Sequence, residues 1–455
     1  MKKSTQPCRI NFRQNSREAL QNTSLRHAMR YATDTFRDKR SNGIQGVPFE
    51  EWRQRASDLK ISVLENLSGY VDQFAANATR RGAIVHRAKD ATQARELVGA
   101  ILRDHNARNI VKAKSMITEE IHLNKYLDDR GFRVIETDLG EYIVQIAGET
   151  PSHILAPALH KTRYQIGKLF CDKLGCDFSD EPHVLTNTAR KVLRPEFIKA
   201  DAGICGANFF VADTGSIVLF TNEGNGRMVT TLPPLLVVVT SIEKALPSIK
   251  DLPLFMRLLP RSATGQVLSS YLSIISGDQI PGLPSGSRRL HVILLDNGRS
   301  EIAAGPYRDI LKCIRCGACM NVCPVYGTIG GHAYESTYPG PMGVILSTLL
   351  NGLERSHPLL DATTLCGACS EVCPVKVPLL KLLYELRERR VEDGYAKSLE
   401  RFGMLGFGLA ANSPFFFETG QALAKALWSL VRLLSPVTVN RLPVPTDRTF
   451  KRRMS

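Results

Sequence analysis

The sequence lacks an apolar run long enough to cross a membrane. A membrane-spanning helix needs roughly 20 consecutive apolar residues, whereas the best candidate, residues 422–434, is shorter and contains Lys425 and Arg432. The basic residues near the N-terminus are also not followed by the apolar stretch of a secretory signal. These absences predict a cytoplasmic protein without a transmembrane span, and they leave contact with a membrane surface open.

Signals for nucleic-acid and dinucleotide binding are missing as well. Lysine and arginine outnumber aspartate and glutamate by 59 to 44, which gives a formal net charge of +15. These basic residues are dispersed, and no nucleic-acid-binding motif accompanies them. The pair Gly224-x-Gly226 does not extend to a dinucleotide fingerprint. We expect no nucleic-acid partner, and a basic surface that helps docking to an acidic protein.

Cysteine is scarce except in one segment. Seven of the eleven cysteines lie between residues 313 and 373, and the others are Cys8, Cys171, Cys176 and Cys205. Without an export signal, this distribution argues against a disulfide framework and favours metal or redox chemistry. The four isolated cysteines are expected to be small buried side chains.

The first cysteine run is Cys313-x2-Cys316-x2-Cys319-x3-Cys323 followed by proline. In bacterial ferredoxins with two clusters, the first three thiolates of such a run bind one iron-sulfur cluster and the fourth binds the other. Zinc sites also use Cys-x2-Cys pairs, but the pairs are separated along the chain. The spacing therefore predicts an iron-sulfur module.

A second run, Cys366-x2-Cys369-x3-Cys373, also ends with proline and has Thr363 where a fourth cysteine would stand. The crossing rule assigns one cluster to Cys313, Cys316, Cys319 and Cys373, and the other to Cys323, Cys366 and Cys369. One iron of the second cluster then has no cysteine ligand. Its ligand is a hydroxyl group, water, a side chain such as His357, a residue of a partner or a substrate; otherwise this iron is absent and the cluster is [3Fe-4S].

Strands and helices alternate before the cysteine runs. Apolar positions at helical spacing predict one long helix from Pro48 to Phe74. Short strands at 83–86, 109–113 and 133–137, with a helix at 118–129, predict a mainly parallel sheet. Apolar segments at 207–212, 216–220, 235–240 and 291–295 either complete this sheet or add an antiparallel layer. We expect a helical N-terminal segment (1–78), an α/β domain (79–300), a two-cluster domain (301–395) and a C-terminal extension (396–455).

Both cysteine runs, the segment Tyr338-Pro-Gly-Pro-Met-Gly343 between them, and residues 206–210, 212–216 and 221–225 resemble the iron-sulfur proteins of the lactate utilization domain family. The resemblance covers roughly residues 70–395. It implies an α/β domain like that of sugar-phosphate isomerases and coenzyme A transferases, joined to a helical ferredoxin-type domain with two [4Fe-4S] clusters. It also implies that the protein and two companion proteins oxidise L-lactate to pyruvate. Seven cysteines are common in this family, so Thr363 is no departure.

Iron-sulfur clusters pass single electrons, whereas oxidation of a hydroxy acid removes two, and a flavin or nicotinamide usually converts between them. Because neither fingerprint is present, we expect an electron-transfer component whose partner performs the chemistry. One alternative is a stand-alone oxidoreductase that binds substrate at the open iron or in the α/β domain near Glu223, the candidate catalytic residue in the loop after the strand 216–220. That loop is equally consistent with a tight turn. Another alternative is a redox sensor.

Overall fold

The computed structural model describes residues 10–278 and 288–396, together with part of residues 398–426. The chain divides into two compact units, residues 1–387 and 388–455. In the second unit, helix α20 (Ser398–Ala411) is described. Cys8 and most of the apolar stretch 422–434 lie outside the described residues. Among the helices of the described part, none is long and apolar enough to cross a bilayer.

Six parallel strands form the main sheet, in the order β1-β10-β7-β4-β2-β3. Alternate residues of β7 face opposite sides: Leu236 and Val238 join one hydrophobic core, and Val237 and Val239 join another. Burial on both faces is typical of parallel sheets, whose strands are continuously apolar. The strands are β1 (Ile84–Ala88), β2 (Asn109–Lys112), β3 (Arg133–Glu136), β4 (Ala202–Cys205), β7 (Leu235–Ser241) and β10 (Arg289–Leu295).

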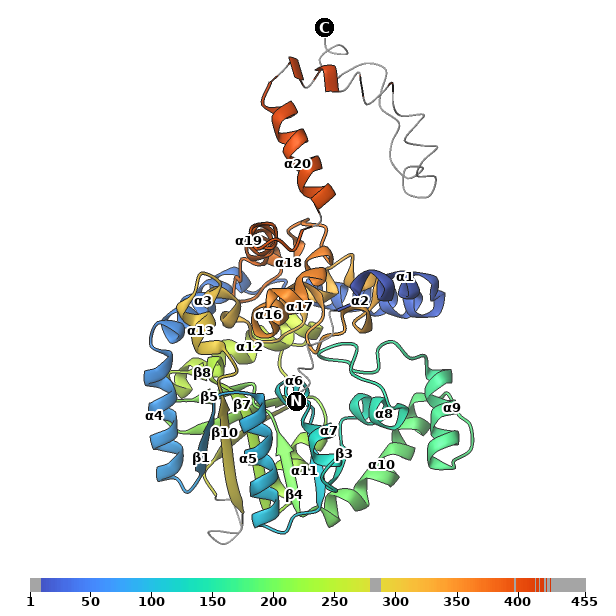
Figure 1. The fold of residues 1–455 in the computed structure, drawn as a ribbon. Coiled ribbons are helices and arrows are strands. Elements are labelled where there is room, and N and C mark those ends of the chain that lie inside the picture. Colours follow the sequence, from blue (N-terminus) through green and yellow to red (C-terminus); the bar gives the residue numbers. More distant parts are fainter. Residues whose placement is uncertain are drawn as a thin grey trace, which may run out of the picture. The chain divides into compact units, whose positions relative to one another are not determined.

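Helices cover both faces of this sheet (Figure 1). The helices α4 (Leu67–Arg80) and α10 (Pro182–Lys199) contribute to one core, and α5 (Ala91–Asp104) and α7 (Leu123–Asp128) to the other. The predicted helix at 118–129 is divided into α6 (Met116–Glu120) and α7, because His122 adopts the left-handed conformation with φ 50°. The remaining helices of this region are α8 (Leu139–Ala147), α9 (Arg163–Leu174), α11 (Asn225–Thr231) and α12 (Leu252–Thr264).

A smaller sheet of four strands has the order β8-β5-β6-β9. Strands β5 (Phe209–Val211) and β6 (Ser216–Thr221) form an antiparallel hairpin, and β9 (Tyr271–Ser276) pairs antiparallel with β6. Strand β8 (Ala245–Leu246) is parallel to β5. Both alternatives considered for the four later apolar segments are therefore correct. Segments 235–240 and 291–295 complete the main sheet, and segments 207–212 and 216–220 belong to the separate layer.

The N-terminal helices are α1 (Phe12–Gln21), α2 (Thr23–Gly43), α3 (Phe49–Glu65) and α4. The single helix predicted from Pro48 to Phe74 is wrong in this respect, because Asn66 leaves the helical region (φ −127°, ψ 40°) between α3 and α4. The apolar stripe itself is real, since Trp52, Val63 and Phe74 are all buried.

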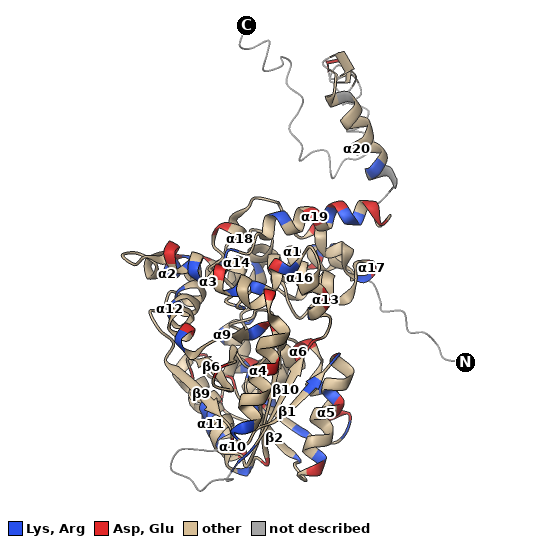
Figure 2. Cartoon of the chain, turned by 90° about the vertical axis from the view of Figure 1, so that its left-hand side faces the viewer, with Lys and Arg blue, Asp and Glu red and all other residues tan. Residues whose placement is uncertain are grey.

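The cysteine-rich segment is mostly helical, so the predicted fold class, an α/β domain plus a helical module, is confirmed. Its longer helices are α16 (Gly340–Asn351) and α19 (Leu379–Glu392), and its short ones include α13 (Arg299–Ala304), α14 (Ala318–Asn321), α15 (Tyr326–Ile329) and α18 (Ala368–Glu371). Phe12, Met29 and Trp52 of the N-terminal helices lie in one hydrophobic core with Tyr326 and Leu382. Basic and acidic residues are interspersed along the described helices and strands (Figure 2).

A candidate iron-sulfur site

The two cysteine runs adopt the same backbone conformation. Arg315 and Gly317 have φ of 60° and 76°, and Leu365 and Gly367, at the equivalent positions, have φ of 55° and 85°. A short helix then begins at the next residue of each run. Positive φ is uncommon for residues other than glycine and costs free energy. Alternation with the left-handed conformation turns successive N–H groups toward one concave side, an arrangement that accommodates anions and many iron-sulfur sites.

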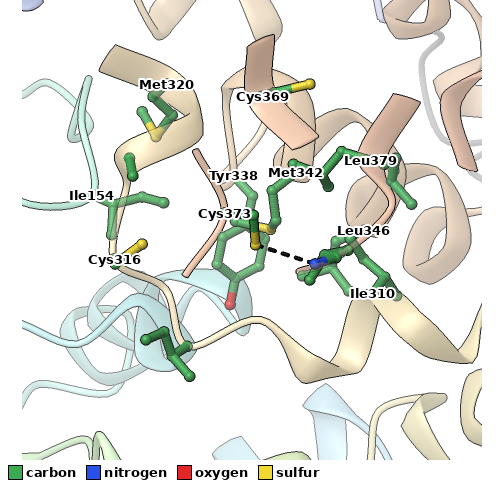
Figure 3. Close-up of a cluster of buried hydrophobic side chains, with 14 of the residues drawn as sticks. Ile154, Ile310, Cys316, Met320, Tyr338, Met342, Leu346, Cys369, Cys373 and Leu379 are labelled. Carbon is green, nitrogen blue, oxygen red and sulfur yellow. Dashed lines mark hydrogen bonds between the residues drawn. The ribbon is translucent and has the colours of Figure 1, made fainter. Parts of the chain in front are cut away.

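Four cysteines from the two runs line one cavity: Cys313, Cys316, Cys319 and Cys373. These are the four residues predicted to hold the first cluster. The rest of the wall is largely apolar and includes Ile314, Met342 and Leu379, and the empty volume is ≈ 360 Å³, part of it open to solvent. Figure 3 shows Cys316 and Cys373 among the buried side chains of this region.

Backbone amides point at the sulfur atoms. The N–H of Arg315 donates to Cys313 Sγ at 3.4 Å, and the N–H of Val377 donates to Cys373 Sγ at 3.3 Å. Burial raises the pKa of the Cys373 thiol to about 11. Such thiols stay protonated unless a metal cation replaces the proton. The donor set and its amides therefore suit a thiolate-bound cluster, whose potential depends on hydrogen bonds to sulfur.

The three cysteines predicted for the second cluster also lie near one another. Cys369 interacts electrostatically with Cys323 and Cys366, and Cys323 with Cys366. Cys366 is exposed, and the N–H of Ala368 followed by the hydroxyl of Thr364 lowers its pKa. Within the second group, Cys366 is therefore open to solvent, whereas Cys323 and Cys369 are buried.

The candidate oxygen and nitrogen ligands have other hydrogen-bond partners. Thr363 Oγ1 accepts a hydrogen bond from the N–H of Leu365 at 3.0 Å. His357 is buried, and its Nδ1 lies 3.2 and 3.1 Å from the carbonyl oxygens of Leu353 and Glu354. The fourth ligand of the second cluster therefore stays a prediction.

A single metal ion is not the better interpretation of these cysteines. Within the described residues, no group of three or more His, Cys, Asp or Glu side chains is close enough to hold one ion. A four-iron cluster has a different requirement, because each thiolate binds a separate iron atom. No disulfide involves the described cysteines, all of which are free. Cys205 is buried as expected, whereas Cys171 and Cys176 are partly exposed, because both lie at the end of the peripheral helix α9.

Glu223 lies in an exposed loop after β6. Partial burial of its carboxyl group, followed by the charge of Asp138, raises its pKa, and Lys114 opposes this shift. Lys114 Nζ lies 3.5 Å from Asp138 Oδ2. Lys114 and Asp138 follow β2 and β3, at the carboxyl end of the sheet where α/β proteins bind ligands. Asn222 of the same loop bonds to Gln266 and Ser270, so the loop also has a structural role.

Sequence reasoning missed a buried charged cluster at the same end of the sheet. Lys112 Nζ lies 2.5 Å from Glu136 Oε1 and 3.0 Å from Glu119 Oε1. Burial raises the pKa of Glu141, which lies in the same group. The sequence signal for this cluster is Lys112 at the end of an apolar strand. Charged residues are rarely buried unless they are paired, so a buried lysine indicates acidic partners nearby.

Sequence reasoning also missed a surface hollow at the ends of β1 and β10. It is lined by Leu64, Val71, Ile242 and Leu294, with Lys89 and Asp296 among its polar residues. Mixed walls of this kind are typical of small-molecule sites.

An α/β domain joined to a helical module with two ferredoxin-like cysteine runs defines an iron-sulfur protein, and family comparisons agree. The LUD domain family matches residues 71–295, and the 4Fe-4S dicluster domain family matches residues 309–377. Lactate utilization protein B of Bacillus licheniformis is 43% identical over 418 residues, which cover 91% of this chain and 88% of that protein. The chain therefore belongs to the lactate utilization protein B family.

Further relatives give the same result. The proteins of that name from Bacillus subtilis (strain 168) and Lysinibacillus sphaericus are 43% and 44% identical, each over 91% of this chain and 87% of the relative. A crystal structure of a DUF162 family protein from Deinococcus radiodurans matches 50% of this chain and 98% of that one, at 20% identity and a TM-score of 0.25. That likeness is too weak to support any argument.

Proposed function

We propose that this protein is the iron-sulfur electron-transfer component of a cytoplasmic system that oxidises L-lactate to pyruvate. The cavity lined by Cys313, Cys316, Cys319 and Cys373 is the observation that carries the proposal. These four residues hold the first [4Fe-4S] cluster, and the second is held by Cys323, Cys366 and Cys369, of which Cys366 is exposed. Each cluster, when bound, takes up and releases one electron.

The electron count of the reaction matches two such carriers. Oxidation of lactate to pyruvate releases two electrons and two protons, and a partner protein performs this step. The residues of this chain have three tasks: they hold the thiolates at fixed positions, exclude water from the first cluster and leave an edge of the second accessible. The exposed Cys366 supports that last task. The names of the relatives support the assignment to lactate utilization.

The test uses the full chain, purified anaerobically together with its two expected companion proteins. Lactate should reduce the clusters, and iron counting should give about seven to eight atoms per chain, since the first cluster has four irons and the second has three or four. Cys316→Ser and Cys369→Ser should each abolish lactate-dependent electron delivery, and Cys205→Ser is the matched control because Cys205 is buried away from the runs. Lactate oxidation at full rate with both ligand variants combined would refute the proposal.

A second candidate function is substrate binding by this chain itself. Two observations favour it: the carboxylate of Glu223 near Lys114 and Asp138, and the hollow beside Ile242 and Leu294. In that case lactate should change the electron paramagnetic resonance spectrum of the isolated chain. Glu223→Gln should remove the effect, and an unchanged spectrum with lactate would exclude this function.

A further inference from the structure

Arg315 and Leu365 occupy the same position in the two cysteine runs. Each directly precedes a cysteine, Cys316 or Cys366, and each has positive φ, 60° and 55°. The backbone at this position is therefore repeated, while the side chain differs between a permanent cation and an apolar group. Because the backbones agree, the difference in charge is the feature that distinguishes the two sites here.

The guanidinium of Arg315 is buried beside the first group of thiols. Its strongest favourable electrostatic partner is Cys313, to whose sulfur its own N–H also donates. Arg315 Nη2 lies 3.2 Å from Glu243 Oε1, and the guanidinium carbon lies 5.1 Å from the ring centroid of Tyr338. A side chain with these contacts cannot swing away into solvent, so its charge stays next to the sulfur atoms.

Three further cations of the described part of the chain interact with cysteines of the first group. Arg40 interacts with Cys316, Arg53 with Cys373, and Lys60 with Cys313. Carboxylates also lie near these cations. Glu243 is shared by Arg315 and Arg299, Glu371 lies close to Arg40, and Glu50 Oε2 lies 2.6 Å from Arg53 Nη1.

The second group of thiols has a different environment. Among the described residues, the strongest charge interactions of Cys323 and Cys369 are those with the other cysteines of their own group. Arg387 approaches the second run, and there it binds the carbonyl oxygens of Leu360 and Thr363 at 2.9 and 3.4 Å. The fixed positive charge next to sulfur is therefore concentrated at the first site.

We propose that Arg315 makes the first cluster the easier one to reduce, so that electrons enter at the exposed second cluster and collect at the first. This inference rests on the cluster assignment of the proposed function. Reduction adds one negative charge to a cluster, and a neighbouring fixed cation stabilises that charge. Solvent exposure at Cys366 likewise stabilises the reduced form of the second cluster, and this effect opposes the proposed order. However, a buried charge pair is screened much less than an exposed one, so the cation has the larger effect.

This direction places the stored electron beside the α/β domain. Glu243, which binds Arg315, follows β7 at the carboxyl end of the main sheet. The preceding residue, Ile242, lines the hollow at the ends of β1 and β10. An electron acceptor bound there would receive electrons from the first cluster, while the partner that oxidises lactate would dock at the second.

The test compares four full-length variants, reconstituted anaerobically, by redox titration monitored by electron paramagnetic resonance. Thr363→Cys changes a ligand position of the second cluster only, so it identifies the signal of that cluster. Arg315→Gln removes the charge and should lower the reduced-to-oxidised ratio of the first cluster about tenfold at a given potential, a shift of about 59 mV for one electron. Arg315→Lys keeps the charge and should restore most of the ratio.

Leu365→Arg is the reciprocal variant, which adds a cation to the second run in place of a partly buried leucine. It should raise the ratio of the second cluster and leave that of the first unchanged. Unshifted ratios in iron-loaded Arg315→Gln and Leu365→Arg would overturn the inference alone. Equal shifts in Arg315→Gln and Arg315→Lys would also overturn it, since geometry rather than charge would then be responsible. If the unmodified protein binds no iron, the proposed function fails as well.

Discussion

Replacing Arg299 by methionine should be the most damaging single change outside the cysteines. Arg299 is completely buried and binds Glu120 through two nitrogens, at 2.7 and 2.9 Å. Its Nε also forms an ion pair with Glu243 at 2.9 Å. Tyr338 donates to Glu120 and lies under Arg315, so these five side chains form a closed ring between the α/β domain and the first cysteine run.

The magnitude follows from Glu120 and Glu243, the two carboxylates that would lose Arg299. Tyr338 and Arg315 would still contact them. Removing one member of a buried ion pair typically costs about 3–5 kcal/mol, because the other charge is left uncompensated. Burial would raise the pKa of Glu243, but Arg299 and then Arg315 hold it at about 2 instead of 4.5. At 1.36 kcal/mol per pKa unit, this difference corresponds to about 3 kcal/mol for all the groups that lower this pKa together, of which Arg299 is the largest.

The sign of the pH dependence is also determined. Because the folded-state pKa of Glu243 is below its ordinary value, this stabilisation is complete above pH 4.5 and is lost as the pH falls from 4.5 to about 2. An experiment at pH 7 therefore measures all of it.

The assay is urea unfolding followed by circular dichroism under anaerobic conditions. A loss of 3 kcal/mol lowers the midpoint by about 1 M if the denaturant slope is about 3 kcal/mol/M. The matched control is Arg133→Met, which removes an exposed arginine paired with Glu196 and should cost at most about 1 kcal/mol. If Arg299→Met costs no more than Arg133→Met, the ring does not stabilise the fold and the reasoning fails.

Three further predictions concern the clusters and one histidine pair. Oxidation should interconvert three-iron and four-iron forms at the second cluster only, and Thr363→Cys should suppress this; absence of a three-iron resonance under mild oxidation would contradict it. Chelation should expose residues 305–380 to protease before residues 80–300, because metal ligation supplies much of the local folding energy; equal cleavage rates would count against this. Burial, followed by the neighbouring His86, lowers the pKa of His291 to about 4. Its contribution to stability is therefore complete above pH 6.5 and is lost as the pH falls toward 4. His291→Gln should flatten the unfolding midpoint over this interval in cluster-free protein, and an unchanged pH profile would refute the assignment.

The class of fold could be predicted from sequence because the patterns of apolar residues that indicate strands and helices are local. Apolar strands such as β7 and the alternation of strands with helices indicate a parallel sheet without any long-range information. Some helix boundaries could not be predicted, because the helix is interrupted at a single residue that is neither proline nor glycine. Asn66 and His122 are examples, and neither residue type excludes a helix, so the two interruptions were missed.

The candidate site was partly predictable for the same reason. The spacing of Cys313, Cys316 and Cys319 within seven residues predicts that they bind one cluster. The rule that the last cysteine of each ferredoxin run binds the other cluster then adds Cys373. No spacing rule relates Arg315 to Glu243 or Arg299, since these residues come from different elements and meet only through the tertiary fold. Buried charge networks of this kind have no sequence signature beyond an unexpected polar residue in an apolar environment.

The core shared by the N-terminal helices and the cysteine-rich segment also constrains biosynthesis. Arg53 donates to the carbonyl oxygen of Cys373, a residue 320 positions later in the chain. Ribosomes add about 5–20 residues per second, so the apolar residues of α1 and α3 that pack on the cysteine-rich segment wait roughly 15–60 s for the last part of their shared core. During this time they are exposed apolar groups that a chaperone would have to protect. Iron delivery must follow translation of the last cysteine, and a chain released early would lack both its cofactor and the partner of its first helices.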